Sequence, residues 1–333
     1  MDVTVAICTR NRARSLDRTL ESLAQMRIPD GLAWEVVVVN NNSTDDTDSV
    51  IGNYATQLPI RREFEAKPGL SNARNRAVVA ARGRYIVWTD DDVIVDPAWL
   101  SAYVAAFQRW PDAVLFGGKI LPELEGPVPA WLKEAYPIVA GAFALRDFGD
   151  EPLPLTLEGR RIPFGPSFAL LAEEQRAHPY DVELGHKLGR PTIRGEEVAV
   201  VESILRARKT GYWVPEAKVR HCISRQQQSL EYLRNFYMGL GRNNAYHDRD
   251  SRAPRLFGVP RWLWRRILRS AWQYHRYRLT SRLAVWMEYY VGYMVGRGEL
   301  EFWRRRHQRG LYGAPAKRTG REERLAGGFS GRD

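Results

Sequence analysis

The sequence predicts an α/β protein: a mostly parallel sheet flanked by helices, followed by a helical C-terminal extension. Residues 2–8 (DVTVAIC) and 34–39 (WEVVVV) are rich in β-branched residues, as buried strands are. A helical pattern lies between them, because Leu16, Leu20 and Leu23 recur at spacings of four and three. Alternation of strand and helix is typical of a parallel sheet covered by helices.

The alternation continues along the first third of the chain. A helical stretch over residues 71–81 precedes a third apolar run, Tyr85 to Trp88. Asp96 and Pro97 are typical of a helix start, so a further helix is expected to run through Phe107.

The pattern changes after residue 120. Residues 121–165 contain many prolines and glycines and are expected to form long loops around a site. A helix is predicted near 196–209, a strand near 211–214, and helices over much of 228–305. The tail after Gly310, rich in glycine and basic residues, is expected to be disordered.

The composition limits the class and the compartment. The chain has 333 residues, of which 44% are hydrophobic, enough for a sizeable core. Cys8 and Cys222 are too few for a disulfide framework and fit a reducing compartment. The first residues form a predicted strand rather than a secretory signal, and no apolar stretch approaches the ~18–20 residues of a membrane-spanning helix. The sequence therefore predicts a cytoplasmic protein, free or at a membrane surface.

The positive charge is confined to one end of the chain. The formal net charge is +11, yet residues 251–333 carry +13 and residues 1–250 carry −2. Any attraction to an anionic surface therefore belongs to the C-terminal quarter.

The strongest local signal is Asp90-Asp91-Asp92, directly after the apolar run. Because side chains alternate in an extended segment, Asp90 and Asp92 are expected to point the same way. Open α/β sheets bind ligands at the carboxyl ends of their strands, and carboxylates suit Mg²⁺ or Mn²⁺, which in turn bind phosphate. The alternative is a solvated acidic turn before the next helix.

Two further polar segments follow predicted strands. Residues 40–47 (NNNSTDDT) suit turns and helix caps, or side-chain amides presented to a nucleobase. Residues 67–77 (KPGLSNARNRA) place Lys67, Arg74 and Arg76 around a helix start, where backbone N–H groups favour anions. Ordinary capping with surface arginines is the alternative for both.

Together these segments resemble a known family. VAICTRNRARSLDRTLESL, EVVVVNNNSTDDT and KPGLSNARNRAVVAARGRYIVWTDDD resemble, in order and spacing, the nucleotide-binding half of family 2 glycosyltransferases with the GT-A fold. PFGPSFAL resembles the glycine loop before the acceptor site, and LGHKLGRPTIRGEEVAVVESILRARKTGYWVPEAKVRH resembles the acidic base motif and its downstream histidine. The resemblance spans roughly residues 2–245.

The resemblance implies a role for each matching position. The residues that bind the nucleotide-sugar would be Thr9, Arg10, Asn41, Arg74, Asp90 and Asp91. Asp90, Asp92 and His221 would hold a divalent cation, Mn²⁺ or Mg²⁺, and Glu197 would be the catalytic base. Gly165, Ser167 and Glu196 would contact the acceptor or its loop. Without the resemblance, Glu196 and Glu197 also fit first-turn acids favoured by a helix dipole, and His221 fits a packed histidine.

The implied reaction transfers a sugar, with inversion, from a nucleotide-sugar to a hydroxyl of a glycan or lipid-linked acceptor. The expected donor is a UDP-sugar, and the expected setting is cell-surface polysaccharide or glycoconjugate synthesis. Residues 1–120 would bind the nucleotide-sugar, 121–225 the acceptor, and 226–333 would form the basic helical region. A sugar nucleotidyltransferase should have a glycine-rich segment after the first strand, and CTRNRARS has no glycine. A nucleic-acid-binding protein is the other alternative, but the near-neutral body disfavours it and no nucleic acid partner is expected.

The segment 260–279 is amphipathic on a helical wheel. Leu263, Trp264, Ile267, Leu268, Ala271 and Tyr274 share one arc, opposite Arg261, Arg265, Arg266, Arg269 and Arg276, with Trp272 at the border. Such a helix suits the interface of an anionic membrane, here the inner face of the plasma membrane. The alternative is that it packs on the catalytic domain with its arginines in water.

Overall fold

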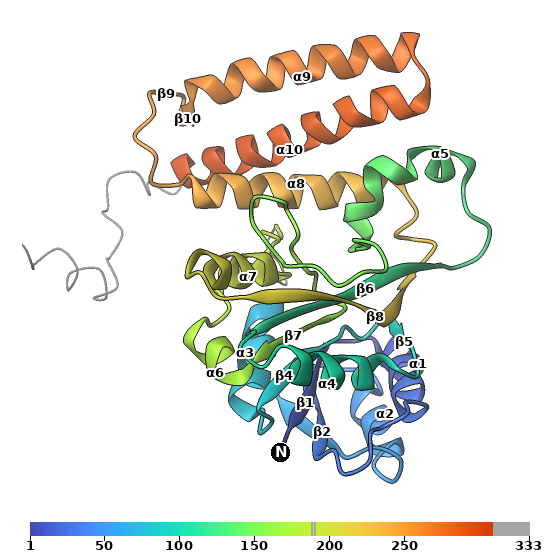
Figure 1. The fold of residues 1–333 in the computed structure, drawn as a ribbon. Helices are drawn as coiled ribbons and strands as arrows, with labels where there is room; N and C mark the ends of the chain where they lie inside the picture. Colours follow the sequence, from blue (N-terminus) through green and yellow to red (C-terminus); the bar gives the residue numbers. More distant parts are fainter. Residues whose placement is uncertain (188, 190, 309–333) are drawn as a thin grey trace, which may run out of the picture.

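The computed structural model describes residues 1–187, 189 and 191–308. The expected disordered tail after Gly310 lies outside the described residues. Within them, an eight-stranded sheet forms the centre of the molecule, and a separate layer of long helices lies beyond one of its edges (Figure 1).

The sheet is mostly parallel in its first half and mixed in its second. Its strands, in spatial order, are β3 (Ile60–Phe64), β2 (Trp34–Asn40), β1 (Val3–Thr9), β4 (Tyr85–Trp88), β7 (Phe168–Leu171), β6 (Leu115–Leu124), β8 (Gly211–Ile223) and β5 (Val93–Val95). β3, β2, β1 and β4 are parallel, as are β6 and β8, whereas β7 and β5 run antiparallel to their neighbours.

Helices cover both faces of this sheet, which explains the uninterrupted apolar runs of the strands. The flanking helices are α1 (Ala13–Ala24), α2 (Thr47–Asn53), α3 (Leu70–Ala80), α4 (Trp99–Arg109), α6 (Ala172–Ala177) and α7 (Glu196–Arg206). Val36 and Val38 share a buried cluster with α1 and α4, while Val37 and Val39 share another with α3 and α7. The predicted strands, the helices around Leu16 and Ser71, and the α/β class are confirmed.

The strand order places a ligand crevice between two strands. The chain moves from β1 outward to β2 and β3, and then returns through α3 to β4 on the other side of β1. Ligands bind open α/β sheets at such a reversal, outside the carboxyl ends of the strands. Thr9 ends β1 and Asp90 follows β4, so both lie at this crevice.

The prediction of long loops over residues 121–165 is wrong in part. β6 continues to Leu124, and α5 (Ala130–Val139) and the short helix η1 (Ala140–Phe143) follow it. The predicted strand at 211–214 likewise extends to Ile223, because β6 and β8 pair in parallel past an irregularity at Gly118 and Lys119. Glycine, lysine and proline within β6 hid its strand character, and only pairing with β8 reveals it.

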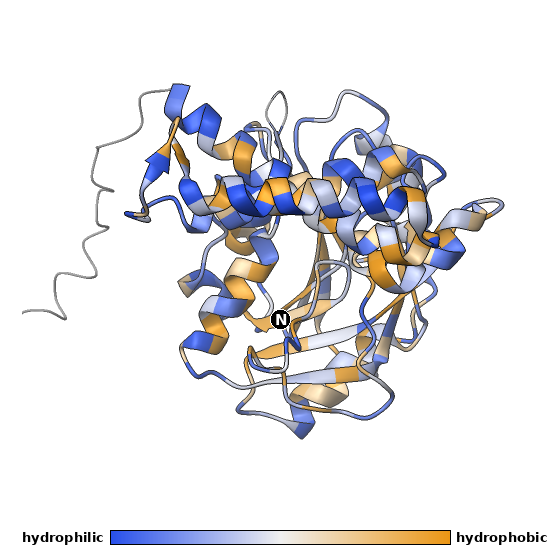
Figure 2. Ribbon diagram, turned by 90° about the horizontal axis from the view of Figure 1, so that it is seen from above, coloured by the Kyte–Doolittle hydropathy of each residue, from blue (hydrophilic) through white to orange (hydrophobic). Residues whose placement is uncertain are grey.

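The C-terminal region is a layer of helices, as expected. It consists of α8 (Leu230–His247), α9 (Arg261–Thr280) and α10 (Leu283–Gln308), with a small hairpin of β9 (Arg255–Leu256) and β10 (Val259–Pro260) before α9. α10 lies between α8 and α9, and α9 is the outermost element (Figures 1 and 2). Residues of α5, η1, the end of β8 and all three helices share one buried cluster, so this layer is part of the folded body.

The predicted apolar arc of α9 turns inward rather than toward a membrane. Leu263, Ile267 and Tyr274 are buried against the helical layer, because α10 offers an apolar surface at that side. The part of the amphipathic prediction that assigned these residues to a lipid surface is therefore wrong. Leu268, from the same arc, remains exposed.

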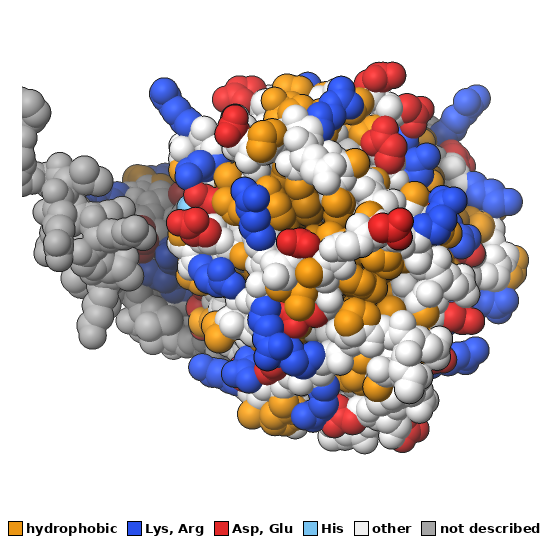
Figure 3. Space-filling model, turned by 60° about the horizontal axis from the view of Figure 1, so that its bottom comes forward, with side chains coloured by type: hydrophobic (Ala, Val, Ile, Leu, Met, Phe, Trp, Pro, Cys, Tyr) orange, Lys and Arg blue, Asp and Glu red, His pale blue; other side chains and the backbone are white. Residues whose placement is uncertain are grey.

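No helix among the described residues is long and apolar enough to cross a membrane. The face of the molecule away from the helical layer carries acidic and basic side chains interspersed with hydrophobic ones (Figure 3). That face therefore has no single dominant charge, which fits the near-neutral sum of residues 1–250.

Gly298→Ala is expected to destabilise the protein by about 1–3 kcal/mol, the usual cost of overpacking. A Cβ at Gly298 would overlap the backbone carbonyl group of Met238, so α8 and α10 would have to separate. Gly292→Ala is the matched control on the same helix, since a Cβ there meets nothing within 4 Å. Urea unfolding should show a loss for Gly298→Ala and a small gain for Gly292→Ala. Equal midpoints would show that the helices are not in close backbone contact.

Candidate active site

A hydrogen bond links the segments at the carboxyl ends of β1 and β4, where the crevice is expected. The Thr9 hydroxyl donates to Asp91 Oδ2 at 2.7 Å, although 82 positions separate the two residues. Asp91 and Asp92 are both buried, and Asp90 is more exposed. The acidic segment is therefore fixed at the edge of the sheet and is not a solvated turn.

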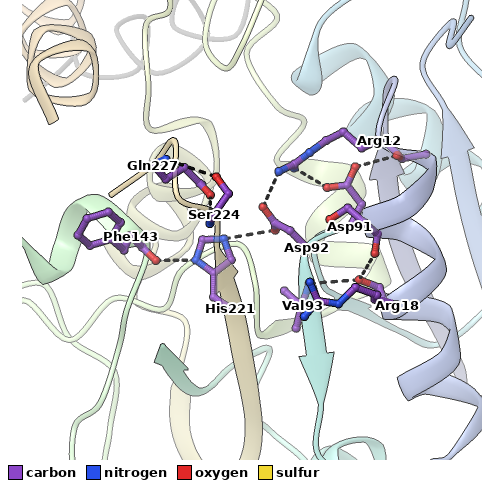
Figure 4. A network of polar contacts seen from close by, with 12 residues as sticks. Arg12, Arg18, Asp91, Asp92, Val93, Phe143, His221, Ser224 and Gln227 are labelled. Atoms are coloured by element: carbon purple, nitrogen blue, oxygen red, sulfur yellow. Dashed lines mark hydrogen bonds and ion pairs between the residues drawn. The ribbon is translucent and has the colours of Figure 1, made fainter. Parts of the chain in front are cut away.

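Arg12 bridges two of the three aspartates (Figure 4). Its Nη1 donates to Asp91 Oδ1 at 2.6 Å, and its Nη2 donates to Asp92 Oδ2 at 2.8 Å. Arg12 stands in the turn after β1, where Asn11 adopts a left-handed conformation with φ of 51°. This guanidinium is a direct counter-charge to the acidic segment.

His221 reaches Asp92 from the other side (Figure 4). Its Nε2 lies 3.2 Å from Asp92 Oδ1, and its Nδ1 donates to the Phe143 carbonyl oxygen at 2.7 Å. Burial by itself lowers the pKa of His221, but the Asp92 carboxylate outweighs it and raises the pKa to about 9. Burial opposes ionisation of Asp92 as well, yet His221 and Arg12 hold its pKa well below the usual range. Asp92 is therefore a carboxylate at neutral pH.

Arg74 lies beneath the site and connects its two acidic groups. The side chain is only 4% exposed, with Nη2 at 3.5 Å from Asp90 Oδ1. Its Nη1 lies 3.7 Å from Glu196 Oε1 and 3.9 Å from Glu197 Oε2. Gly165 lies directly above, since a Cβ there would come within 2.8 Å of the guanidinium. α3 thus supplies one buried cation for acids of β4 and α7.

Glu196 and Glu197 occupy the first turn of α7, and their environments differ. Burial raises the pKa of Glu197 to about 7, the adjacent Glu196 adds to the rise, and Arg74 opposes it. A carboxyl group with a pKa near the working pH is suited to proton transfer. The first turn of α7 thus places a carboxyl group that titrates near neutral pH on the same arginine, Arg74, as Asp90.

Two residues expected at the site have other partners. The Asn41 amide donates to the carbonyl oxygens of Glu65 and Lys67, both at 2.9 Å, and accepts from Gly69 N–H, so it fixes a loop and both of its N–H donors are engaged within the fold. Ser167 is fully buried, and its hydroxyl binds Trp99 and Tyr103 in the core, so it does not face an acceptor. Thr9, Arg74, Asp90, Asp91, Asp92, Gly165, Glu196, Glu197 and His221 gather around the crevice, and Arg10 lies at its rim, bonded to the Asn41 carbonyl oxygen.

Sequence reasoning missed three arginines of the site. Arg12 carried no signal beyond its place after the first strand. Arg146 stacks on Phe164, with its guanidinium carbon 3.5 Å from the ring centre, and its charge is felt by Glu197. Arg194 stacks on Phe236 at 4.5 Å. Within the described part of the chain, the Nε atoms of Arg146 and Arg194 are buried without a hydrogen-bond partner.

The donor set of Asp90, Asp92 and His221 fits a hard divalent cation by its chemistry, although no ready-made cluster of three ligands occurs in the described residues. The Nδ1 bond of His221 to a backbone carbonyl is the arrangement that holds a ligating histidine in place with Nε2 toward the metal. Asp92 is shared by Arg12 and His221, so a cation would have to displace contacts that now neutralise it.

The chain is similar to known proteins in sequence. Residues 4–145 match the glycosyl transferase family 2 profile. A glucosyl-dolichyl phosphate glucuronosyltransferase of Haloferax volcanii is 25% identical over 253 residues, covering 73% of this chain and 76% of that protein.

Two solved structures share the fold. One is the mannosyltransferase PcManGT from Pyrobaculum calidifontis, in complex with GDP-Man and Mn²⁺, with a TM-score of 0.55 and 16% identity over 94% of this chain and 76% of that one. The other is S. aureus TarS 1–349 in complex with UDP, with a TM-score of 0.52 and 18% identity over 94% and 93% of the two chains.

The sheet, its flanking helices and these two structures define the GT-A fold. Residues 4–145 belong to glycosyl transferase family 2, and the chain is a glycosyltransferase, as the resemblance predicted.

Arg74→Met is expected to lower the free energy of unfolding by about 3–5 kcal/mol at pH 8, because it leaves Asp90, Glu196 and Glu197 without their buried counter-charge. The deficit should shrink as the pH falls toward 5, since burial raises the pKa values of Asp90 and Glu197 and their protonation removes uncompensated charge. Arg76→Met is the control on the same helix: Arg76 is 44% exposed and pairs with Glu63, a contact of at most ~1 kcal/mol. Denaturant titration measures both, and equal losses would place Arg74 among ordinary surface pairs.

Proposed function

We propose that the protein transfers a sugar from a nucleoside diphosphate to the hydroxyl of a lipid-phosphate-linked acceptor, with inversion and with the help of a divalent cation. The observation that carries this proposal is that two carboxyl groups of the site differ in their pKa values. Asp92 is held ionised by Arg12 and His221, while Glu197 has a pKa of about 7 caused by burial, and Arg74 joins the two groups.

Asp90, Asp92 and His221 would hold the cation. Such an ion supplies charge stabilisation to a departing diphosphate. The structure of PcManGT, which shares the fold, is a complex with GDP-Man and Mn²⁺, and that of TarS is a complex with UDP, which supports a cation and a nucleotide donor. Residues of the protein keep Asp92 ionised, and the hydrogen bond from Thr9 to Asp91 fixes the acidic segment 90–92.

Glu197 would act as the base. Its carboxylate takes the proton of the acceptor hydroxyl as the oxygen bonds to the anomeric carbon, and the bond from that carbon to the diphosphate breaks. Attack from the face opposite the leaving group inverts the configuration. Separate positions for the base on α7 and the leaving-group site on β4 support this geometry.

Arg146 and Arg194 support an acceptor that carries a negative charge. Both lie on aromatic rings of the site region, and among the described residues neither forms an ion pair. A partly buried guanidinium without a carboxylate partner favours a bound anion such as a phosphate. The H. volcanii relative is a glucosyl-dolichyl phosphate glucuronosyltransferase, which supports a lipid-phosphate-linked acceptor.

Glu197→Gln is expected to lower turnover about 10²- to 10⁴-fold, because the amide cannot accept the acceptor's proton. Glu196→Gln should retain most activity. The wild type's kcat/KM should rise with unit slope as the pH increases to about 7 and then level off, because Glu197 must be ionised. The variant should lack this limb. Turnover is measured as release of nucleoside diphosphate from UDP-, GDP- and dTDP-sugars in the presence of Mn²⁺. The acceptor is glucosyl-dolichyl phosphate in one series and water in the other. An active Glu197→Gln beside an inactive Glu196→Gln would reassign the base.

The outer face of α9 supports contact with an anionic membrane. It exposes Trp262, Leu268, Trp272 and Leu279 among Arg261, Arg265, Arg269, Arg276 and Arg278. α9 contains no acidic residue, and none of these five arginines forms an ion pair within the described residues. Exposed tryptophan and leucine beside arginines fit the headgroup region of a bilayer, where each basic residue contributes about 1 kcal/mol. A bilayer surface there would bring the enzyme to lipid-linked acceptors.

The double variant Trp272→Glu/Leu279→Glu is expected to lose co-sedimentation with phosphatidylglycerol vesicles, because it places two negative charges on the outer face of α9. Val79→Glu is the control, since Val79 is 76% exposed on α3, close to the 87% of Leu279. The wild type should pellet with these vesicles, less so in high salt, and not with phosphatidylcholine vesicles. Pelleting of the double variant equal to that of Val79→Glu would rule out this face.

A further inference from the structure

Arg12 occupies the side of Asp92 that a cation needs. Nη1 of Arg12 binds Asp91, and Nη2 binds Oδ2 of Asp92 (Figure 4). The other oxygen of Asp92, Oδ1, faces His221. Both oxygens of Asp92, one of the two carboxylates expected to hold the cation, are therefore engaged by positive groups. A cation cannot reach Asp92 on the Arg12 side without displacing this guanidinium.

The backbone of Arg12 is fixed, while its side chain is not enclosed. Asn11 N–H donates to the Ser43 hydroxyl at 3.0 Å, and Ala13 N–H donates to Asp45 Oδ2 at 3.0 Å, so both neighbours are tied to the 40–47 segment. The Arg12 side chain is 44% exposed, in contrast to the 5% and 8% of Asp91 and Asp92. The guanidinium can therefore move without moving the turn.

The two partners of Arg12 are not equivalent. Asp91 also accepts the Thr9 hydroxyl, which holds it toward β1, whereas Asp92 is shared with His221. If Nη1 stays on Asp91, release of Asp92 leaves Nη2 free beside the acidic segment. That nitrogen is then an unpaired donor of a positively charged group next to the expected place of the diphosphate, where a planar guanidinium binds oxygens well.

We propose that Arg12 is an exchange residue: it neutralises Asp92 when no cation is bound, and it turns to the donor's diphosphate when the cation takes Asp92. This inference rests on the cation site of the proposed function. The conformation with Arg12 on Asp92 competes with the cation, so the apparent affinity of the nucleotide-free enzyme for the metal is reduced by the fraction of molecules in that conformation. The same arginine then favours a diphosphate over a monophosphate.

Arg12→Gln separates these two effects, because they have opposite signs. In Mn²⁺ titrations followed by electron paramagnetic resonance without nucleotide, the variant should bind the ion about tenfold more tightly than the wild type. In calorimetry with Mn²⁺ present, the ratio of UDP to UMP affinity should fall about tenfold, since a charge-assisted contact to the second phosphate is lost. Arg18→Gln is the matched control: Arg18 is 41% exposed and pairs with Glu125, and it should change neither measurement.

A merely structural role for Arg12 predicts weaker Mn²⁺ binding in the variant, together with a lower unfolding temperature, and that result overturns the exchange. Unchanged Mn²⁺ affinity also overturns it. If neither protein binds Mn²⁺, the cation site itself fails along with this inference, whereas binding by the wild type without a gain in the variant rejects only the exchange. Should Arg12→Gln not fold, Arg12→Lys serves, because one ammonium group bridges two carboxylates less well and should give a smaller gain of the same sign.

Discussion

The pairing of buried carboxylates with arginines at the carboxyl edge of the sheet is the interaction on which the rest of the site depends. Acids from β4 and α7 meet there, and in a buried setting each needs a counter-charge to remain ionised. Arg74 from α3 lies between Asp90 and the glutamates of α7. Arg12 from the turn after β1 pairs with Asp91 and Asp92. Helix α3 and the first turn are therefore held to the sheet by charge as well as by apolar packing.

Unequal neutralisation makes the acids chemically different. Asp92 has two close positive partners and keeps a low pKa despite its burial, whereas Glu197 shares Arg74 with two other acids and has a raised pKa because burial dominates. A permanently charged group and a group that titrates near neutral pH are the two kinds of carboxylate that a glycosyl transfer requires. His221 together with Arg12 keeps Asp92 ionised, whereas the single buried Arg74 does not offset the burial of Glu197.

The helical layer completes the site and adds a surface. Phe143, which orients His221, belongs to η1, and η1 shares its core with α5, α8 and α10. Tyr232 of α8 donates to the Ala142 carbonyl oxygen, which ties the layer to the same short helix. The orientation of a site histidine therefore depends on packing of the C-terminal third, while the outermost helix of that layer presents arginines and tryptophan to the outside.

The sequence by itself determined the α/β class, the strands β1, β2 and β4, the helices α1, α3 and α4, and the acidic segment after β4, because these are local patterns of period two or 3.6 and of turn chemistry. It did not predict α2 and β3, which lie between β2 and α3. Its resemblance to the family also pointed to Glu197 and His221, which lie close to Arg74 and Asp92 respectively. Only the tertiary structure decided that Asn41 and Ser167 are engaged within the fold, that Arg12 sits on Asp91 and Asp92, and that Leu263, Ile267 and Tyr274 face α10. Those outcomes depend on contacts between residues far apart in sequence, and side-chain partners over such separations are set by packing and charge balance that no local pattern contains.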